Sequence, residues 1–137
     1  MRGRRWAQYY AAREVAMPKY RGGCHCGAVQ YEVEGEIADL AVCNCSICAK
    51  TAYIHWHVSP ENFHLLTPEE GIETYEFGTR TAKHWFCRVC GISSFRRSRT
   101  SPESIDVNVR CLQGVDAERF ETKLFDGQNW ERAAASR

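Results

Sequence analysis

Three cysteines within six residues are the part of this sequence best suited to chemistry. Cys43, Cys45 and Cys48, called the trio below, form the run Cys-Asn-Cys-Ser-Ile-Cys. Alternate side chains of an extended backbone point to the same side, and a following turn can return Cys48 to the other two. The trio therefore predicts a site for a soft metal, best Zn²⁺, with a fourth position open. An open position is typical of a catalytic zinc site.

A second group of cysteines comes in two pairs that are far apart in the chain. Cys24 and Cys26 are separated by one residue, and Cys87 and Cys90 belong to a Cys-x-x-Cys-Gly zinc knuckle, in which Gly91 is expected at positive φ. Together these four, called the quartet, predict a closed structural site. Such a site contributes roughly 10–16 kcal/mol of folding free energy. We therefore expect two zinc ions per chain, one structural and one catalytic.

The sequence leaves more than one interpretation open for Cys111 and for two histidines. A free cysteine is most often a small buried apolar residue, but Cys111 could instead close the trio and make that site structural. His55 and His57 follow the trio in sequence and could act as an acid or a base. They could equally be structural histidines on a half-exposed strand.

A disulfide-bonded, secreted domain is the other way to use eight cysteines in 137 residues. Arg2, Arg4 and Arg5 stand near the N-terminus, but no apolar stretch follows them, so we see no secretory signal. Cysteines separated by one or two residues rarely reach disulfide geometry, whereas such spacing is common in metal sites. The sequence therefore favours a metal-binding, cytoplasmic protein.

Composition and charge fit one globular domain. Apolar residues make up 44% and aromatic residues 12% of the chain. No apolar run reaches the roughly 18 residues that would predict a membrane span. Residues 1–16 hold four arginines and one glutamate, a net +3, so the rest of the chain carries −2 of the total +1. This charge argues against a nucleic-acid partner. We expect residues 1–16 to be an N-terminal extension, disordered or a short helix.

Short alternating patterns predict a mainly β fold. Val29, Tyr31 and Val33 alternate with polar residues, as in a half-buried strand. Further strands, separated by Gly and Pro residues, are expected within 39–43, 50–59, 63–66, 72–77, 82–95, 105–111 and 120–125, with a short helix over 129–135. We expect these elements to form one β domain around the metal sites.

Three blocks of the sequence resemble the glutathione-dependent formaldehyde-activating (GFA) enzyme family, which also includes centromere protein V. They are Gly-Gly-Cys-His-Cys-Gly-Ala-Val from Gly22, the trio run followed by Lys50, and Phe-Cys-Arg-Val-Cys-Gly from Phe86. The run Phe-Asp-Gly-Gln-Asn-Trp-Glu from Phe125 is similar to the centromere protein V branch. The resemblance covers about residues 19–134 and implies an Mss4-like β-tent of short antiparallel strands organised around zinc, a GFA-like domain over 17–137.

The resemblance also implies a function, although a fold carries over better than a reaction. The implied enzyme adds the thiol of glutathione to formaldehyde, giving S-hydroxymethylglutathione, and belongs to the carbon–sulfur lyases. The trio would be catalytic and the quartet structural, and a small thiol such as glutathione would be the partner. The alternative is a non-catalytic, zinc-folded binding module resembling centromere protein V.

The basic run Arg96, Arg97 and Arg99 has a place in this hypothesis. A solvated loop is the plain interpretation of three arginines. The functional one is capture of the carboxylates of glutathione, which a guanidinium binds through paired hydrogen bonds.

Overall fold

The fold is known from a computed structural model, which describes residues 17–136. The predicted extension over residues 1–16 lies outside the described residues. Within this range the strands are β1 (Lys19–Gly23), β2 (Gln30–Glu34), β3 (Ala41–Cys43), β4 (His55–Val58), β5 (Phe63–Leu65), β6 (Ile72–Tyr75), β7 (His84–Cys87), β8 (Phe95–Arg96), β9 (Ile105–Asn108) and β10 (Lys123–Phe125), and the α-helix of the described residues is α2 (Trp130–Ala135). The predicted mainly β class, with one short C-terminal helix, is confirmed.

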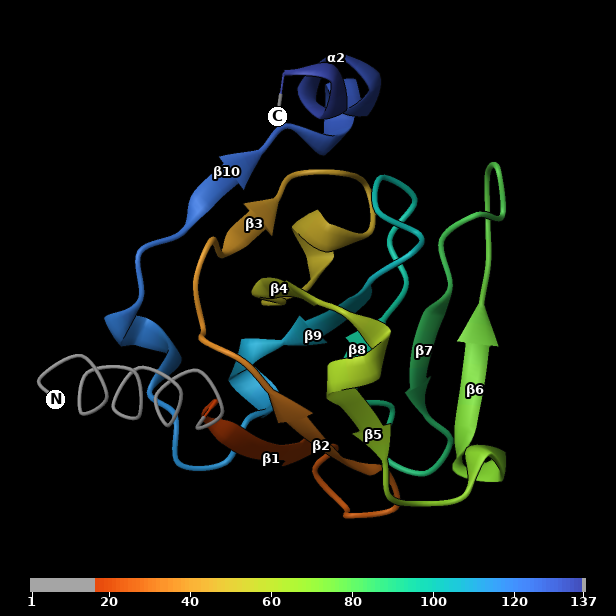
Figure 1. The fold of residues 1–137 in the computed structure, drawn as a ribbon. Coiled ribbons are helices and arrows are strands. Elements are labelled where there is room, and N and C mark those ends of the chain that lie inside the picture. The colour runs from red at the N-terminus through yellow and green to blue at the C-terminus, as the bar shows by residue number, and fades with distance from the viewer. Residues whose placement is uncertain (1–16, 137) are drawn as a thin grey trace, which may run out of the picture.

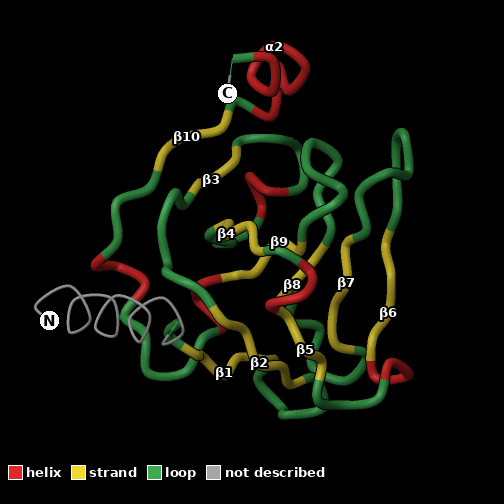
Figure 2. The backbone as a smooth tube through the Cα atoms, in the orientation of Figure 1, coloured by secondary structure: helices red, strands yellow, loops and turns green. Residues whose placement is uncertain are grey.

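The strands form three small sheets that wrap around a common core (Figure 1). Their strand orders are β1-β2-β5, β10-β3-β4-β9-β8 and β6-β7. In Figure 1 the first sheet lies at the bottom, the β6–β7 pair on the right, and β3, β10 and α2 at the top. Loops and short 3-10 turns make up most of the connections (Figure 2). No helix among residues 17–136 is both long and apolar enough to cross a bilayer.

The alternation predicted for the first sheet is observed in β2. Tyr31 and Val33 are fully buried, whereas their neighbours in the strand are half-buried. The Tyr31 hydroxyl donates to the carbonyl of Ser94 at 3.0 Å, and its ring packs edge-on against Phe95 with 5.6 Å between centroids. Because Phe95 belongs to β8, this side chain joins the first sheet to the second.

β4 is shorter and more buried than the sequence indicates. The predicted strand over 50–59 begins only at His55, because the chain first makes a 3-10 turn, η1 (Cys48–Lys50), which starts at the last cysteine of the trio. β4 then pairs with β3 on one side and with β9 on the other. Three of the four residues of β4 are buried, and His55 is only 4% exposed.

The C-terminal strand returns to the trio. β10 pairs with β3 in parallel, with Phe125 opposite Cys43, whereas the other named pairs are antiparallel. Asn44 Nδ2 donates to Asp126 Oδ1 at 3.0 Å, and the backbone N–H of Gln128 donates to Asn44 Oδ1 at 3.1 Å. These bonds place the segment after β10 against the cysteine loop.

Candidate metal centres and pocket

The quartet meets in space although its two pairs are about 60 residues apart in the chain. Cys24 and Cys26 lie in the loop between β1 and β2, while Cys87 ends β7 and Cys90 lies in the turn that follows. All four sulfurs are within 4.8 Å of one another, and Cys26 Sγ is 3.7 Å from that of Cys24 and 3.6 Å from that of Cys87. A tetrahedral zinc with bonds of about 2.3 Å would hold its sulfurs about 3.8 Å apart. The quartet therefore fits a single zinc ion.

Backbone donors surround the knuckle half of the quartet. The N–H groups of Val89 and Cys90 donate to Cys87 Sγ at 3.3 Å and 3.4 Å. Gly91 has a φ of 80°, as expected for the knuckle glycine. A hydrogen bond from the backbone of Cys90 lowers the pKa of Cys87, and one from Ile92 lowers the pKa of Cys90 to about 6. These donors favour thiolates, the form that binds metal.

The trio has the arrangement that its spacing predicts: three sulfur donors and no fourth donor from the described residues. Its sulfurs lie within 4.8 Å of one another, and among residues 17–136 no other His, Cys, Asp or Glu completes the group. The chain turns as expected, so that the N–H of Cys48 donates to Cys45 Sγ at 3.4 Å and the N–H of Cys45 donates to Cys43 Sγ at 3.5 Å. The trio therefore fits a metal ion that keeps a fourth position for another ligand.

The two outer sulfurs of the trio differ in acidity. A hydrogen bond from the Cys48 thiol lowers the pKa of Cys43 to about 5. The same hydrogen bond and burial raise the pKa of Cys48 above its usual value, in spite of the nearby Arg96. Cys43 is thus a thiolate at neutral pH, as a soft-metal ligand must be.

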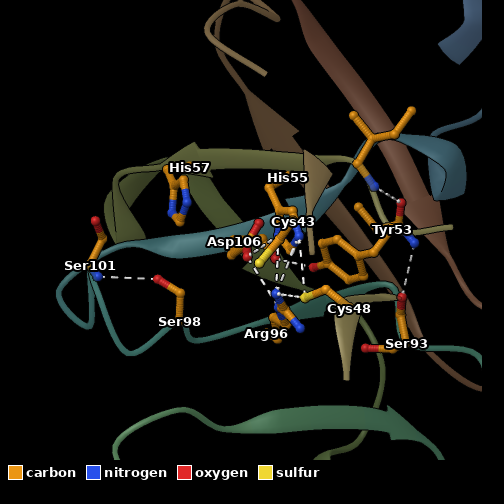
Figure 3. A network of polar contacts seen from close by, with 12 residues as sticks. Cys43, Cys48, Tyr53, His55, His57, Ser93, Arg96, Ser98, Ser101 and Asp106 are labelled. Carbon is orange, nitrogen blue, oxygen red and sulfur yellow. Dashed lines mark hydrogen bonds and ion pairs between the residues drawn. The ribbon is translucent and has the colours of Figure 1, made fainter. Parts of the chain in front are cut away.

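A buried polar network lies beside the trio (Figure 3). Arg96 Nη2 donates to Cys48 Sγ at 3.0 Å, and Arg96 Nε donates to Asp106 Oδ2 at 3.2 Å. His55 Nδ1 donates to the same carboxylate oxygen at 2.7 Å. Burial alone would raise the pKa of Asp106, but the hydrogen bond from His55 and the charge of Arg96 hold it below its usual value. Cys48, His55, Arg96 and Asp106 thus form one connected unit.

Sequence reasoning missed part of this network. The solvated-loop interpretation is wrong for Arg96, which is only 8% exposed and contained in β8. The sequence gives no signal for Asp106, because a polar residue between Ile105 and Val107 has the pattern of a solvent-facing strand position. In the structure Asp106 is fully buried, because both faces of its strand are covered and all four residues of β9 are buried.

The other histidines take separate places around the pocket. His57 is half-buried and lies 3.1 Å from Ser104 Oγ through its Nδ1. His84 is buried, and Arg96 Nη1 lies 3.3 Å from its Nδ1. Burial and the charge of Arg96 lower the pKa of His84 to about 4, so this ring is neutral at physiological pH. It can therefore accept a hydrogen bond from Arg96.

Cys111 does not close the trio. It belongs to neither group of clustered ligand atoms, and its sulfur lies 4.0 Å from the carbonyl of Ser93. Burial and the charges of Cys24 and Cys90 raise its pKa to about 11. All eight cysteines lie in the described range, and none of them is bridged to another. The disulfide alternative is not observed.

A cavity of about 440 Å³ opens onto the trio. Its lining includes Cys43, Cys45, His55, Arg96, Arg99 and Trp130. The Arg99 guanidinium lies 4.2 Å from the centre of the Trp130 ring and donates to the carbonyl of Gly127 at 3.4 Å. The start of α2 therefore builds one wall of the cavity, and Arg99 carries a positive charge there.

Gly127 lets the C-terminal segment approach the trio. A Cβ at this buried position would lie 2.5 Å from Cys43 Sγ and 2.7 Å from Cys45 Cβ. Real Cβ atoms do not come so close to other atoms, so only glycine fits here without a shift of the cysteines.

Taken together, the fold and the site define a small β domain with two cysteine clusters that could hold zinc, one closed and one open to a pocket. The family model "Glutathione-dependent formaldehyde-activating enzyme" matches residues 19–128, and the chain belongs to this GFA family. A crystal structure of a Rhodobacter sphaeroides protein, a structural genomics target, is similar with 40% identity and a TM-score of 0.69. That match covers 76% of this chain and 98% of the other. Trp130 and α2 follow the family match.

Proposed function

We propose that this protein is a zinc-dependent carbon–sulfur lyase that adds a small thiol, glutathione or a similar one, to formaldehyde or a related electrophile. The observation that carries the proposal is the trio: three unbridged sulfurs lie within 4.8 Å of one another, and Cys43 and Cys45 line a cavity of about 440 Å³. Membership of the GFA family supports the same reaction class. We place the reaction in the cytoplasm, where thiols stay reduced.

The two cysteine groups would divide the metal chemistry. Cys24, Cys26, Cys87 and Cys90 would hold a structural zinc, and Cys43, Cys45 and Cys48 a catalytic one. A zinc ion held by three thiolates would supply a positive centre that lowers the pKa of a substrate thiol and keeps it as a thiolate.

The chain's own residues would orient the reactants and manage the proton. The substrate sulfur forms a bond to the carbonyl carbon, the C=O π bond breaks onto oxygen, and the thiol proton ends on the new hydroxyl, with no net oxidation. His55 and His57 line the cavity and are the candidates to carry that proton. The apolar wall that includes Phe125 and Trp130 would exclude water from the reacting atoms.

A direct test measures the exchange between free thiol and hemithioacetal in mixtures of glutathione and formaldehyde, by NMR, with and without the zinc-loaded full-length protein. The proposal expects exchange well above the spontaneous rate. A protein that carries two zinc ions per chain and leaves the exchange rate unchanged would instead support the non-catalytic binding module.

Arg99 is the arginine of the basic run that we expect to bind substrate. Arg96 is held in the buried network, and the guanidinium of Arg97 lies over Trp85, 5.6 Å from the ring centre. Arg99 lines the cavity and is stacked on Trp130, which limits the positions of its guanidinium. Glutathione carries carboxylates, so a fixed guanidinium in the cavity would select thiols of this kind.

Changing Arg99 to Ala should therefore raise the KM for glutathione about 10- to 100-fold, the cost of a lost charged hydrogen bond of about 1.5–3 kcal/mol. The KM for 2-mercaptoethanol, which has no carboxylate, should change less than about threefold. Arg88→Ala, which removes an exposed ion pair with Glu73, is the matched control and should leave both values unchanged. An equal loss with both thiols would contradict a carboxylate-binding role.

Changing Gly127 to Ala should disturb the trio and leave the quartet intact, because the new methyl group would overlap Cys43 Sγ. We expect the zinc content to fall from two ions per chain towards one, with a cooperative unfolding transition retained. Gly114→Ala is the matched control, since a Cβ there meets nothing within 4 Å and only local strain is added. Full zinc content in Gly127→Ala would show that the segment after β10 does not constrain the trio.

A further inference from the structure

Arg96 contacts both the trio and the histidine beside it (Figure 3). Its Nη2 lies 3.0 Å from Cys48 Sγ, 3.2 Å from His55 Nδ1 and 3.3 Å from His55 Nε2. Cys48 Sγ and His55 Nε2 are 3.7 Å apart. The carboxylate of Asp106 can only accept, so the Nδ1 of His55 carries the proton of the 2.7 Å hydrogen bond between them. Nε2 is therefore the nitrogen of His55 that can offer a lone pair.

His55 has the features of a metal ligand, yet it is not part of the trio. A carboxylate that orients Nδ1 is the usual support of a metal-binding histidine. The 3.7 Å between Nε2 and Cys48 Sγ is close to the roughly 3.6 Å expected for nitrogen and sulfur ligands of one tetrahedral zinc. His55 nevertheless fails to lie within 4.8 Å of all three sulfurs, whereas the sulfurs satisfy this limit among themselves. The residue that holds the imidazole of His55 in place therefore determines whether the fourth ligand position of the trio stays open.

Arg96 can hold His55 away without displacing Cys48. With a metal ion bound, Cys48 would be a thiolate, whose three lone pairs would let it accept a hydrogen bond from Arg96 and bind the metal as well. Nη2 is almost equally far from the two nitrogens of His55, so the guanidinium lies over the face of the imidazole, and the ring cannot move towards the trio without displacing it. The positive charge of the guanidinium also disfavours a second cation next to Nε2.

Arg96 is itself firmly placed. Its Nε donates to Asp106 Oδ2 at 3.2 Å, its Nη1 lies 3.3 Å from His84 Nδ1, and its guanidinium lies 4.7 Å from the centre of the Tyr53 ring. With 8% exposure, it has little freedom to leave these partners.

We propose that Arg96 is a positioning residue that keeps His55 out of the trio and thereby preserves the open fourth position. This inference rests on the proposed function, because only an open trio can receive a substrate thiol. It deepens that function by naming the residue that distinguishes the open site from a closed, purely structural one with three sulfurs and one nitrogen.

Cobalt-loaded full-length protein provides a test that does not depend on turnover. Binding of a thiol at the trio changes the thiolate-to-cobalt absorption, so a titration with 2-mercaptoethanol measures access to the fourth position. Arg96→Lys keeps a charge for Asp106, but one ammonium group cannot serve Asp106, His55 and Cys48 together. We expect Arg96→Lys to bind the thiol at least about tenfold more weakly than the wild type, the scale of supporting residues around metals.

A second change separates the proposed cause from a general effect of charge. His55→Asn retains a donor for Asp106 but has no atom in the place of Nε2. The double variant Arg96→Lys, His55→Asn should therefore regain the thiol binding that Arg96→Lys loses. If Arg96→Lys does not load cobalt, the double variant Arg96→Met, Asp106→Asn takes its place. It removes both buried charges and should show the same loss of thiol binding.

The outcomes are distinct. A wild-type protein that does not respond to thiol overturns the proposed function. A responsive wild type with equally responsive Arg96 variants overturns the role of Arg96. Weak binding in the variants that His55→Asn does not restore also overturns it, because Arg96 would then act on the thiol itself.

Discussion

Changing Cys45 to Ser is expected to abolish addition of thiol to formaldehyde while the fold persists. Cys45 is the middle ligand of the trio and lies on the cavity wall, with its sulfur accepting the N–H of Cys48 at 3.4 Å. Loss of a residue that only supports a metal ligand costs 10–100-fold, so loss of a ligand should cost at least about 100-fold in kcat/KM. The measurement is NMR exchange of glutathione and formaldehyde, together with zinc content.

The zinc content gives this prediction its second readout. Cys45→Ser should retain one zinc ion per chain, in the quartet, and should melt within about 5 °C of the wild type. Cys111→Ser is the matched control, because Cys111 belongs to neither cluster and its replacement should leave two ions and full activity. Activity that survives the loss of Cys45 would refute the trio as the catalytic site.

Changing Cys87 to Ser should lower the stability of the protein more than Cys45→Ser does, and it should prevent cooperative folding. Cys87 is 1% exposed, belongs to the hydrophobic core and lies 3.6 Å from Cys26 Sγ. A structural zinc site contributes roughly 10–16 kcal/mol. The net stability of a domain is only about 5–15 kcal/mol, so a three-ligand remnant of the quartet should not keep the chain folded.

Circular dichroism during thermal unfolding and zinc content of the purified protein check this result. The wild type and Cys111→Ser should each show one sharp transition, and Cys87→Ser should show none. A folded Cys87→Ser protein with an unchanged transition and one zinc ion per chain would mean that the quartet is not what holds β7 to the first sheet.

Local spacing in the sequence determined a large part of this protein. The two cysteine groups are predicted by one- and two-residue separations, which limit where neighbouring sulfurs can point. The same holds for Gly91 at positive φ and for the burial of Tyr31 and Val33 in β2. Each of these depends on a few neighbouring residues, so a pattern in the sequence is sufficient to predict it.

Only the tertiary structure decided what surrounds the trio. Asp106 and Arg96 occupy positions whose sequence pattern indicates exposure, but both side chains are buried and hydrogen-bonded to each other. The sequence allows His55 to be a structural histidine on a half-exposed strand, whereas in the structure it is buried in β4. The approach of Gly127 follows from the parallel pairing of β10 with β3, which no nearby residues specify. Periodicity tells which side chains of a strand share a face, but not which distant segment covers that face. The partners of a buried charge are therefore set by packing and not by neighbours in the chain.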